Sequence, residues 1–341
     1  MAFIFANALI SWHAKHGRVG MPWQNKRDPY AIWVSEIMLQ QTQVVTVIDY
    51  YNRFMKKFPT IKALAYADEE EVMQLWSGLG YYRRARFLHE GAQMIVGEME
   101  GNFPSDFDMM MKIPGIGRST AGAIAAFSFN QKKAILDGNV KRVLSRYFLI
   151  SEWTGLPKTE KKLWHYAESL LPNKNIDTYT QALMDLGATL CNKKPQCNLC
   201  PLNKTCLAFQ KSKVHLIPTP RPQKKIPTES THMMIIKHHD EILLVKRPQS
   251  GIWGGLWSLP QHENKSITPK TWVKKHFGLE ASLLEKDLKA STTFTHFKLD
   301  ITYSILEAKS QRSKIPHTWL SINTLEGAAI PAIIKRILLK L

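Results

Sequence analysis

A basic, proline-rich segment divides this chain into two parts and limits the possible folds more than any other feature. The stretch KSKVHLIPTPRPQKKIPTES, residues 211–230, contains four prolines among basic residues. Because proline fixes φ and lacks an N–H donor, such a stretch interrupts helices and strands and is typical of a semi-rigid linker. We therefore expect two domains, residues 1–207 and 230–341, joined by a linker over residues 208–229, as the length of 341 residues also suggests.

The two parts are expected to differ in fold class. Before the linker, apolar residues recur at helical spacing and prolines separate the periodic segments. After it, FKLDITYSILEA alternates like a half-buried strand, and THMMIIKHHDEILLVKRP is typical of a hairpin that turns near His239. The sequence therefore predicts a mostly α region followed by an α+β domain. The expected helices cover residues 3–16, 31–57, 69–76, 83–99, 118–129, 138–149, 159–171 and 178–190, then 269–277 and 328–340.

The charge of the chain indicates a polyanionic partner. There are 46 Lys and Arg residues against 28 Asp and Glu residues, which gives a net charge of +18 at pH 7. A basic protein without such a partner is the alternative. No apolar run approaches the ~20 residues of a membrane span, and MAFIFANALISWHAKHG is typical of an amphipathic helix rather than a leader. We expect a cytoplasmic protein that acts on nucleic acid.

All four cysteines lie in one short loop, CNKKPQCNLCPLNKTC. Disulfides are rare in reducing compartments, so Cys191, Cys197, Cys200 and Cys206 are interpreted as metal ligands. Zinc ribbons usually pair two C-x-x-C motifs, and this loop has one. A single compact loop of four thiolates favours an iron–sulfur cluster, although the spacing leaves zinc open.

The stretch SEIMLQQTQV places a lone acid beside the apolar stripe of an expected helix. Glu36, Gln40 and Gln43 recur at i, i+4 and i+7, so they would share the face next to that stripe. A carboxylate is rarely found against a buried surface without a partner or a function. This placement makes Glu36 a candidate for acid–base chemistry.

The loop KIPGIGRSTAGAIAAF is a candidate phosphate-binding turn. Gly115 and Gly117 permit a tight turn with bare N–H groups. The helix that follows adds unpaired N–H groups and its positive dipole end, which together can hold a phosphate without reading the base sequence. An ordinary connection between two helices is the alternative, and the positive charge of the chain favours phosphate binding.

Asp137, in AILDGNVKRVLSRY, occupies an expected helix N-cap. A capping role alone is the simplest interpretation. Because N–H donors and the helix dipole favour the charged carboxylate, we expect Asp137 to stay ionised and to be able to stabilise a cation.

The stretch GLGYYRRARFLHEG interleaves aromatic residues with arginines after two glycines. Such a composition suits neutralisation of a nucleic-acid backbone and insertion into a base stack. Inward packing of the aromatic rings is the alternative.

These motifs occur together in one family. The chain resembles the adenine DNA glycosylases of the MutY type, within the helix-hairpin-helix glycosylase superfamily, from about residue 5 to at least 305. The resemblance implies a helical catalytic region with a 4Fe–4S cluster and a Nudix-like C-terminal domain. The motifs that carry it are Met21-Pro22-Trp23, WVSEIMLQQTQV, GLGYYRRAR, IPGIGRSTAGAI, ILDGNVKRVL, the four-cysteine loop and RPQSGIWGGLWSLP.

The resemblance implies hydrolysis of the N-glycosidic bond of adenine mispaired with 8-oxoguanine or guanine. The adenine would first flip out of the duplex, because its reacting atoms are unreachable inside the stack. Glu36 matches the acid that protonates N7 of the adenine, and burial should raise its pKa. Asp137 matches the carboxylate that stabilises the oxocarbenium-like sugar.

Further site residues follow from the same resemblance, and the implied partner is double-stranded DNA bound by a monomer. The residues implied to contact DNA are Gln40, Gln41, Tyr81, Gly115, Gly117, Ser119, Asn139 and Lys141. Those implied to line an adenine pocket are Met21, Trp23, Gln181 and Met184. Those implied to contact 8-oxoguanine are Thr295 and His296, within FTHF.

The chain departs from the patterns of this family and its relatives at four places. Thr295 stands where the family usually has Ser, and one residue fewer separates Cys191 from Cys197. Ser119 stands where related endonuclease III-type enzymes have a Schiff-base lysine, so a monofunctional glycosylase is expected. The region matching the Nudix helix is rich in lysine and offers only Glu280 as an acid, so a binding role rather than hydrolysis is expected.

Two other functions compete with this interpretation. A bifunctional pyrimidine-lesion glycosylase and lyase would share Asp137, the glycine turn and the cluster. A non-enzymatic iron–sulfur protein could use the charge, the turn and the cluster for DNA binding alone. Both fail to explain an acid at Glu36.

Overall fold

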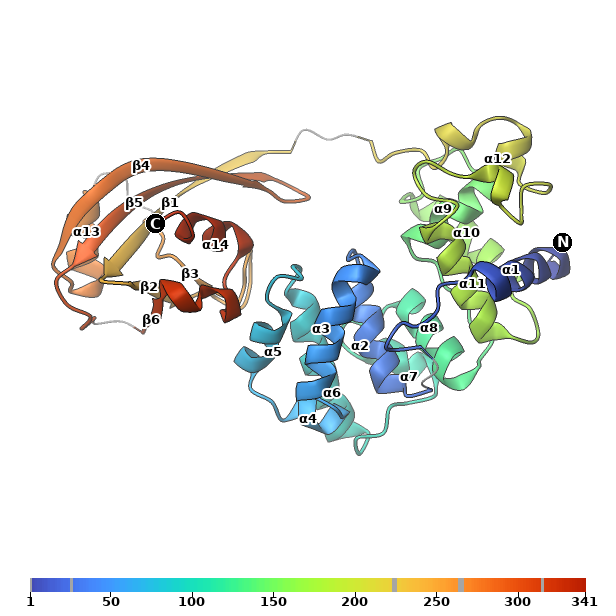
Figure 1. Ribbon diagram of the computed structural model, residues 1–341, viewed down its shortest axis with the longest axis horizontal. Helices are drawn as coiled ribbons and strands as arrows, with labels where there is room; N and C mark the ends of the chain where they lie inside the picture. Colours follow the sequence, from blue (N-terminus) through green and yellow to red (C-terminus); the bar gives the residue numbers. More distant parts are fainter. Residues whose placement is uncertain (1, 25–26, 223–225, 263–266, 314–315) are drawn as a thin grey trace. The chain divides into compact units, whose positions relative to one another are not determined.

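The computed structural model describes two units, over residues 2–24, 27–222, 226–262, 267–313 and 316–341 (Figure 1). The first unit comprises Met1–Ala67 and Phe87–Gln223, and the second joins Asp68–Arg86 to Lys224–Leu341. Within the described ranges, no helix is both long and apolar enough to cross a membrane.

The first unit is helical, and side-chain caps explain where several of its helices begin. Asp28, Asp106 and Asp137 each accept a hydrogen bond from a backbone N–H in the first turn of the helix that follows. The helices are α1 (Ala2–His16), α2 (Pro29–Leu39), α3 (Val44–Lys57), α4 (Ile61–Ala65), α6 (Arg83–Glu98, whose start lies in the second unit), α7 (Phe107–Lys112), α8 (Arg118–Phe129), α9 (Gly138–Tyr147), α10 (Pro157–Ser169), α11 (Ile176–Ala188) and α12 (Leu207–Gln210), with 3₁₀ turns η1 (Cys197–Leu199) and η2 (Val214–Leu216).

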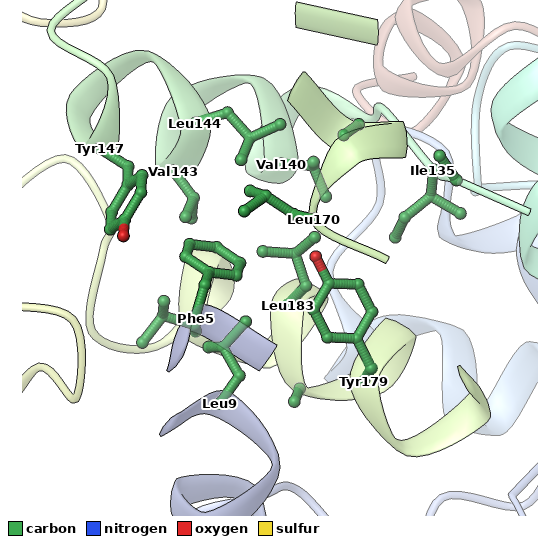
Figure 2. Close-up of a cluster of buried hydrophobic side chains, with 14 of the residues drawn as sticks. Phe5, Leu9, Ile135, Val140, Val143, Leu144, Tyr147, Leu170, Tyr179 and Leu183 are labelled. Atoms are coloured by element: carbon green, nitrogen blue, oxygen red, sulfur yellow. The ribbon is translucent and has the colours of Figure 1, made fainter. Parts of the chain in front are cut away.

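One buried cluster joins α1, α9 and α11 (Figure 2). Phe5 of α1 is fully buried, and its ring lies edge-on to Tyr147 of α9, with centroids 4.8 Å apart. Leu183 of α11 and Val140 of α9 belong to the same cluster. Since apolar burial stabilises by about 25 cal/mol per Å², this cluster holds α9 and α11 against each other. Asp137, Asn139 and Arg142 lie at or near the start of α9, and Gln181 and Asp185 lie on α11.

The second unit contains a six-stranded mixed sheet, with α13 and α14 against its two faces (Figure 1). The strand order is β3-β2-β1-β5-β4, β6 also pairs with β2, and β1 runs parallel to β5. Alternation along β1 sends Met234 to the side of Trp272 in α13 and Met233 to the side of Ile333 in α14. The elements are α5 (Glu69–Trp76), β1 (Thr228–His238), β2 (Glu241–Lys246), β3 (Trp257–Ser258), α13 (Pro269–Phe277), β4 (Ala281–Thr293), β5 (Lys298–Ala308), β6 (Thr318–Ser321), η3 (Ile322–Gly327) and α14 (Ala332–Leu338).

The single helix expected over residues 31–57 is wrong. The chain leaves the helix after Leu39, and Gln41 adopts a left-handed backbone with φ 58°. A second helix then begins after Gln43, which is its N-cap. Gln43 therefore does not share a helical face with Glu36. No glycine or proline marks the break, which is why periodicity alone continued the helix across it.

Three further differences from the expectation concern a strand and two helices. The long strand β4 was not anticipated, because much of it is exposed and its sequence, ASLLEKDLKASTT, alternates poorly. The last helix is shorter than expected, since 3₁₀ turn η3 and Pro331 precede it. The short helix α12 lies inside the segment expected to be linker.

Candidate functional site

Helix α2 places Glu36 between a buried stripe and an open cavity. The helix starts at an Asp28 cap with Pro29 at its first position, an arrangement that fixes its first turn. Trp33, three positions before Glu36, and Ile37, directly after it, are both buried. Glu36 itself is half-buried and lines the cavity. The position expected for Glu36, beside the buried stripe, is confirmed.

Asp137 caps α9 and points its carboxylate at several donors. Val140 N donates to Asp137 Oδ1 at 2.8 Å, and Asn139 Nδ2 donates to Asp137 Oδ2 at 3.2 Å. Arg142 Nη2 in turn donates to Asn139 Oδ1 at 2.8 Å. Because a guanidinium can only donate, it fixes the Asn139 amide with its NH₂ group toward Asp137. The expected N-cap is confirmed, and Asn139 acts on the carboxylate directly.

Both carboxylates line the same cavity, which we call the carboxylate cavity. Its volume is about 1640 Å³, and its walls come from α2, α8, α9, α11 and the loop after α1. It is larger than the 300–1,000 Å³ typical of small-molecule pockets, so it has room for a base with its sugar and phosphate. Nine other residues singled out in the sequence also line it: Met21, Trp23, Gln40, Gln41, Gln43, Ser119, Asn139, Gln181 and Met184.

Burial raises the pKa of both carboxyl groups. Burial, together with the negative charge of Asp137, raises the pKa of Glu36 from 4.5 to about 8. Burial also raises the pKa of Asp137, against the opposing effect of Val140 N–H, the Asn139 amide and the charge of Arg142. The expectation that the cap donors hold the pKa of Asp137 low is therefore wrong, because burial outweighs them. Glu36 has no such set of donors, and its pKa is raised into the neutral range.

The raised pKa of Glu36 predicts how the free energy of unfolding depends on pH. The pKa of Glu36 is higher in the folded chain than in the unfolded chain, so the folded state binds the proton more tightly. Stability should therefore fall as pH rises from about 4.5 to about 8 and then level off. We expect Glu36→Gln to be roughly 2–4 kcal/mol more stable than the parent at pH 9, with little difference at pH 5. Urea unfolding of both proteins at pH 5, 7 and 9 measures this.

The matched control for this prediction is Glu168→Gln. Glu168 is an exposed carboxylate that pairs with Arg118, so its replacement removes a charge without relieving burial. The prediction would be contradicted if the free energies of unfolding of the parent and of Glu36→Gln differed by the same amount at pH 5 and at pH 9.

The segment before Asp137 is attached to α8 by a hydroxyl group. Leu136 N donates to Ser119 Oγ at 2.9 Å, so the serine expected at the site anchors the backbone that leads to the carboxylate. Gln40 Nε2 lies 3.4 Å from Thr120 Oγ1 on the same helix, a long contact. Gln41 is exposed at the cavity and keeps its left-handed backbone, which costs about 1–3 kcal/mol in a residue other than glycine.

The glycine turn before α8 has the expected backbone. Gly115 has φ 81°, and a Cβ there would also lie 3.0 Å from Phe87 Cβ. Gly117 is the N-cap of the twelve-residue helix α8, and a Cβ there would meet nothing within 4 Å. The turn therefore leaves the helix N-terminus open on its outer side, as a phosphate site requires.

Lys141, Tyr81, Thr295 and His296 do not line the carboxylate cavity. Lys141 Nζ pairs with Glu160 Oε1 at 2.6 Å. Tyr81 belongs to the second unit, is 52% exposed and has φ 48°. Thr295 and His296 are exposed in the turn between β4 and β5, with Thr295 Oγ1 3.4 Å from His296 Nδ1.

The four cysteines surround one small, mostly apolar cavity next to α9. Arg146 donates to Asn192 O at 2.8 Å and lies 3.4 Å from Cys191 Sγ. Burial and the neighbouring cysteines raise the pKa of Cys200 to about 12. In the described part of the chain, no three Cys, His, Asp or Glu side chains lie close enough to share a single metal ion.

An ion pair that the motifs did not reveal lies behind the cavity wall. Asp185 of α11 is fully buried, and Arg18 Nε donates to its Oδ1 at 2.8 Å. Arg18 lines the carboxylate cavity. The available signal was an acid one turn after Gln181, in the apolar C-terminal half of α11. Its partner lies 167 residues away in sequence.

Comparison with protein families gives two matches. A model described as HhH-GPD superfamily base excision DNA repair protein matches residues 34–169, and a NUDIX domain model matches residues 231–340. The chain is 37% identical over 344 residues to an adenine DNA glycosylase of Buchnera aphidicola subsp. Acyrthosiphon pisum, covering 98% of this chain and 97% of that protein. It is 33% identical over 403 residues to the adenine DNA glycosylase of Homo sapiens, covering 98% and 73%.

Solved structures resemble the helical part. A thermostable thymine-DNA glycosylase aligns with a TM-score of 0.57 at 29% identity, covering 62% of this chain and 97% of that chain. An endonuclease III–DNA complex aligns with a TM-score of 0.51 at 22% identity, covering 61% and 94%, and so shares the fold. The matches confirm the expected fold class of a helical helix-hairpin-helix region followed by a Nudix-like domain.

Proposed function

The chain belongs to the adenine DNA glycosylase family, and from this premise we propose that it removes adenine paired with 8-oxoguanine or guanine. As a family member it is a DNA N-glycosylase of base excision repair. The adenine must leave the stack before its glycosidic bond can be reached, and the carboxylate cavity has room for the flipped nucleotide. The observation that carries the proposal is one cavity lined by two carboxyl groups, of which Glu36 has its pKa raised to about 8.

Each carboxyl group has a distinct proposed role. Glu36, with its pKa raised to about 8, carries the proton at neutral pH and donates it to N7 of adenine. The C1′–N9 bond then breaks with its electron pair going to the base. Asp137 stabilises the cationic sugar until water adds at C1′. Asn139, oriented by Arg142, holds Asp137 in place.

Ser119 supports a hydrolytic, monofunctional reaction. Its hydroxyl accepts a hydrogen bond from Leu136 N and offers no amine for a Schiff base. Lys193, however, is an exposed lysine at the edge of the same cavity. Borohydride trapping of the parent and of Lys193→Ala is expected to give little covalent adduct in either protein. Efficient trapping by the parent would contradict the monofunctional assignment.

We propose that the second unit binds the 8-oxoguanine strand through Thr295 and His296. Phe294 N donates to Phe297 O at 2.8 Å, and the two rings stack with centroids 4.7 Å apart. Thr295 and His296, which lie between the two phenylalanines in sequence, are exposed to solvent at the tip of this turn. A hydrolytic role has no support in α13, whose sequence PKTWVKKHF lacks an acid, while the nearby Glu280 pairs with Lys274 at 2.8 Å.

We propose a 4Fe–4S cluster as the cofactor. Cys191, Cys197, Cys200 and Cys206 would hold the cluster as its four thiolate ligands. Four thiols that line one cavity, with a single C-x-x-C pair among them, support the cluster over zinc. Arg142 Nε donates to Cys191 O at 2.7 Å, which holds the cysteine loop against α9.

Metal analysis tests the cofactor. The purified protein should contain about four irons and four sulfides per chain and absorb visible light. Cys197→Ser should lose most of both, whereas Asn203→Ser, which changes a residue lining the same cavity without removing a thiol, should keep them. One zinc per chain with no visible absorbance would contradict the cluster.

The proposed substrate is tested by single-turnover base release from matched duplexes. Adenine should be released fastest opposite 8-oxoguanine, more slowly opposite guanine or cytosine, and not measurably opposite thymine. A duplex with thymine opposite guanine tests the activity that names the structural relative. Faster release of thymine than of adenine, or equal rates for adenine opposite thymine and 8-oxoguanine, would overturn the proposal.

A further inference from the structure

The buried carboxylate of Asp185 joins two walls of the carboxylate cavity. Arg18 N donates to Asp185 Oδ2 at 2.8 Å, and its guanidinium approaches Oδ1 at 2.7 and 2.8 Å. Gln181 Nε2 donates to the same Oδ1 at 2.9 Å. His13 Nε2 lies 3.3 Å from Oδ2 but is not aligned for a hydrogen bond. Arg18, His13 and Gln181 all line the cavity, so Asp185 supports it from behind.

Arg18 also begins the loop over residues 18–24, which forms another wall of the cavity and is held in shape by its own hydrogen bonds. Gln24 Nε2 donates to Arg18 O at 2.8 Å, and Met21 N donates to Gln24 Oε1 at 3.1 Å. Met21 and Trp23 are nearly buried within this loop, and both line the cavity. The position of the loop relative to α11 therefore depends on the ion pair between Arg18 and Asp185.

The Asp185 carboxylate accepts from both Arg18 and Gln181, which determines how the Gln181 amide is turned. The amide must direct its NH₂ group toward Asp185. Its carbonyl oxygen then remains for the cavity, and within the described part of the chain nothing donates to that oxygen. A free acceptor in a base pocket selects a ligand with an amino group over one without.

We propose that Asp185 is a positioning residue that orients the Gln181 amide and thereby gives the cavity its preference for a purine with an exocyclic amino group. The inference rests on the proposed function, since it concerns the base held in the carboxylate cavity. An asparagine at position 185 could donate as well as accept, so the Gln181 amide would no longer have a single favoured orientation.

The test compares release of adenine and of unsubstituted purine, each placed opposite 8-oxoguanine. Asp185→Asn should lower the adenine-to-purine ratio of kcat/KM by roughly 5- to 20-fold, the effect expected for one oriented hydrogen bond. A purely structural role would slow both bases equally and leave the ratio unchanged. Glu168→Gln, which breaks an exposed ion pair in the same unit, should keep the parent ratio.

A second comparison separates amide orientation from other effects of the substitution. In a Gln181→Met background there is no amide to turn, so adding Asp185→Asn should not change the ratio further. A further loss of the ratio in that background would overturn the inference.

A second variant covers the case in which Asp185→Asn fails to fold. Arg18→Met combined with Asp185→Leu replaces the ion pair with apolar groups, which usually costs much less than breaking it. This double variant should also lose the preference, and retention of the parent ratio would overturn the inference. If the parent itself releases no adenine, the proposed function fails instead, so the two failures are distinguishable.

Discussion

Glu36→Gln is expected to lower the rate of adenine release by about 10³-fold while leaving DNA binding nearly unchanged. Glutamine keeps the size and hydrogen-bonding capacity of the side chain but has no proton of suitable acidity. The buried position that raises the pKa of Glu36 to about 8 is what makes it a proton donor at neutral pH. Single-turnover rates with adenine opposite 8-oxoguanine, and binding to the same duplex, measure the two quantities.

The comparison with Asp137→Asn sharpens this result. Replacement of Asp137 should also slow release strongly, but it removes a negative charge that helps to raise the pKa of Glu36. Residual activity of Asp137→Asn should therefore decline at lower pH than that of the parent. Full activity of Glu36→Gln would show that the acid acts elsewhere, and equal loss of DNA binding would point to a structural role.

Gly122→Ala is expected to cause the largest loss of stability, about 3 kcal/mol or more. A Cβ on Gly122 of α8 would lie 2.2 Å from Ala134 O, a backbone atom that no side-chain rotation can move. The segment after Ala134 leads directly to Asp137 and is attached to α8 through Leu136 N and Ser119 Oγ. Displacing that segment should reduce adenine release as well as the midpoint of unfolding.

Gly97→Ala is the matched control for this substitution. Gly97 is also helical, but nothing lies within 4 Å of its Cβ position. Alanine there should stabilise the chain by roughly 0.5–1 kcal/mol, because it lowers the backbone entropy of the unfolded state. Thermal and urea unfolding of both variants measures the difference. If the two substitutions changed stability equally, close packing of α8 on the Ala134 backbone would not be the cause.

Local sequence signals were sufficient where the physics is local. The Asp137 cap is confirmed because a cap needs only a carboxylate and the N–H groups of the next turn. The turn at Gly115 is confirmed because a positive φ favours glycine wherever it occurs. Glu36 was recognised as unusual because helical periodicity separates a buried stripe from its neighbouring face.

Prediction from the sequence failed where residues far apart in the chain determine the local structure or the pKa. The break at Gln41 carries no glycine or proline, and only the packed structure separates α2 from α3. The direction of the pKa shift of Asp137 was misjudged because burial, which the sequence does not show, outweighs the cap donors. The ion pair of Arg18 with Asp185 spans 167 positions, so no local pattern could indicate it.

The sequence by itself determined the two-part architecture, the candidate acids and the four grouped cysteines, because charge, periodicity and spacing are properties of neighbouring residues. Only the tertiary structure decided that Glu36 and Asp137 share one cavity, and that the pKa of Glu36 is raised to about 8. The physical reason is that proton affinity depends on desolvation and on nearby charge, and both arise only when segments about a hundred residues apart pack together.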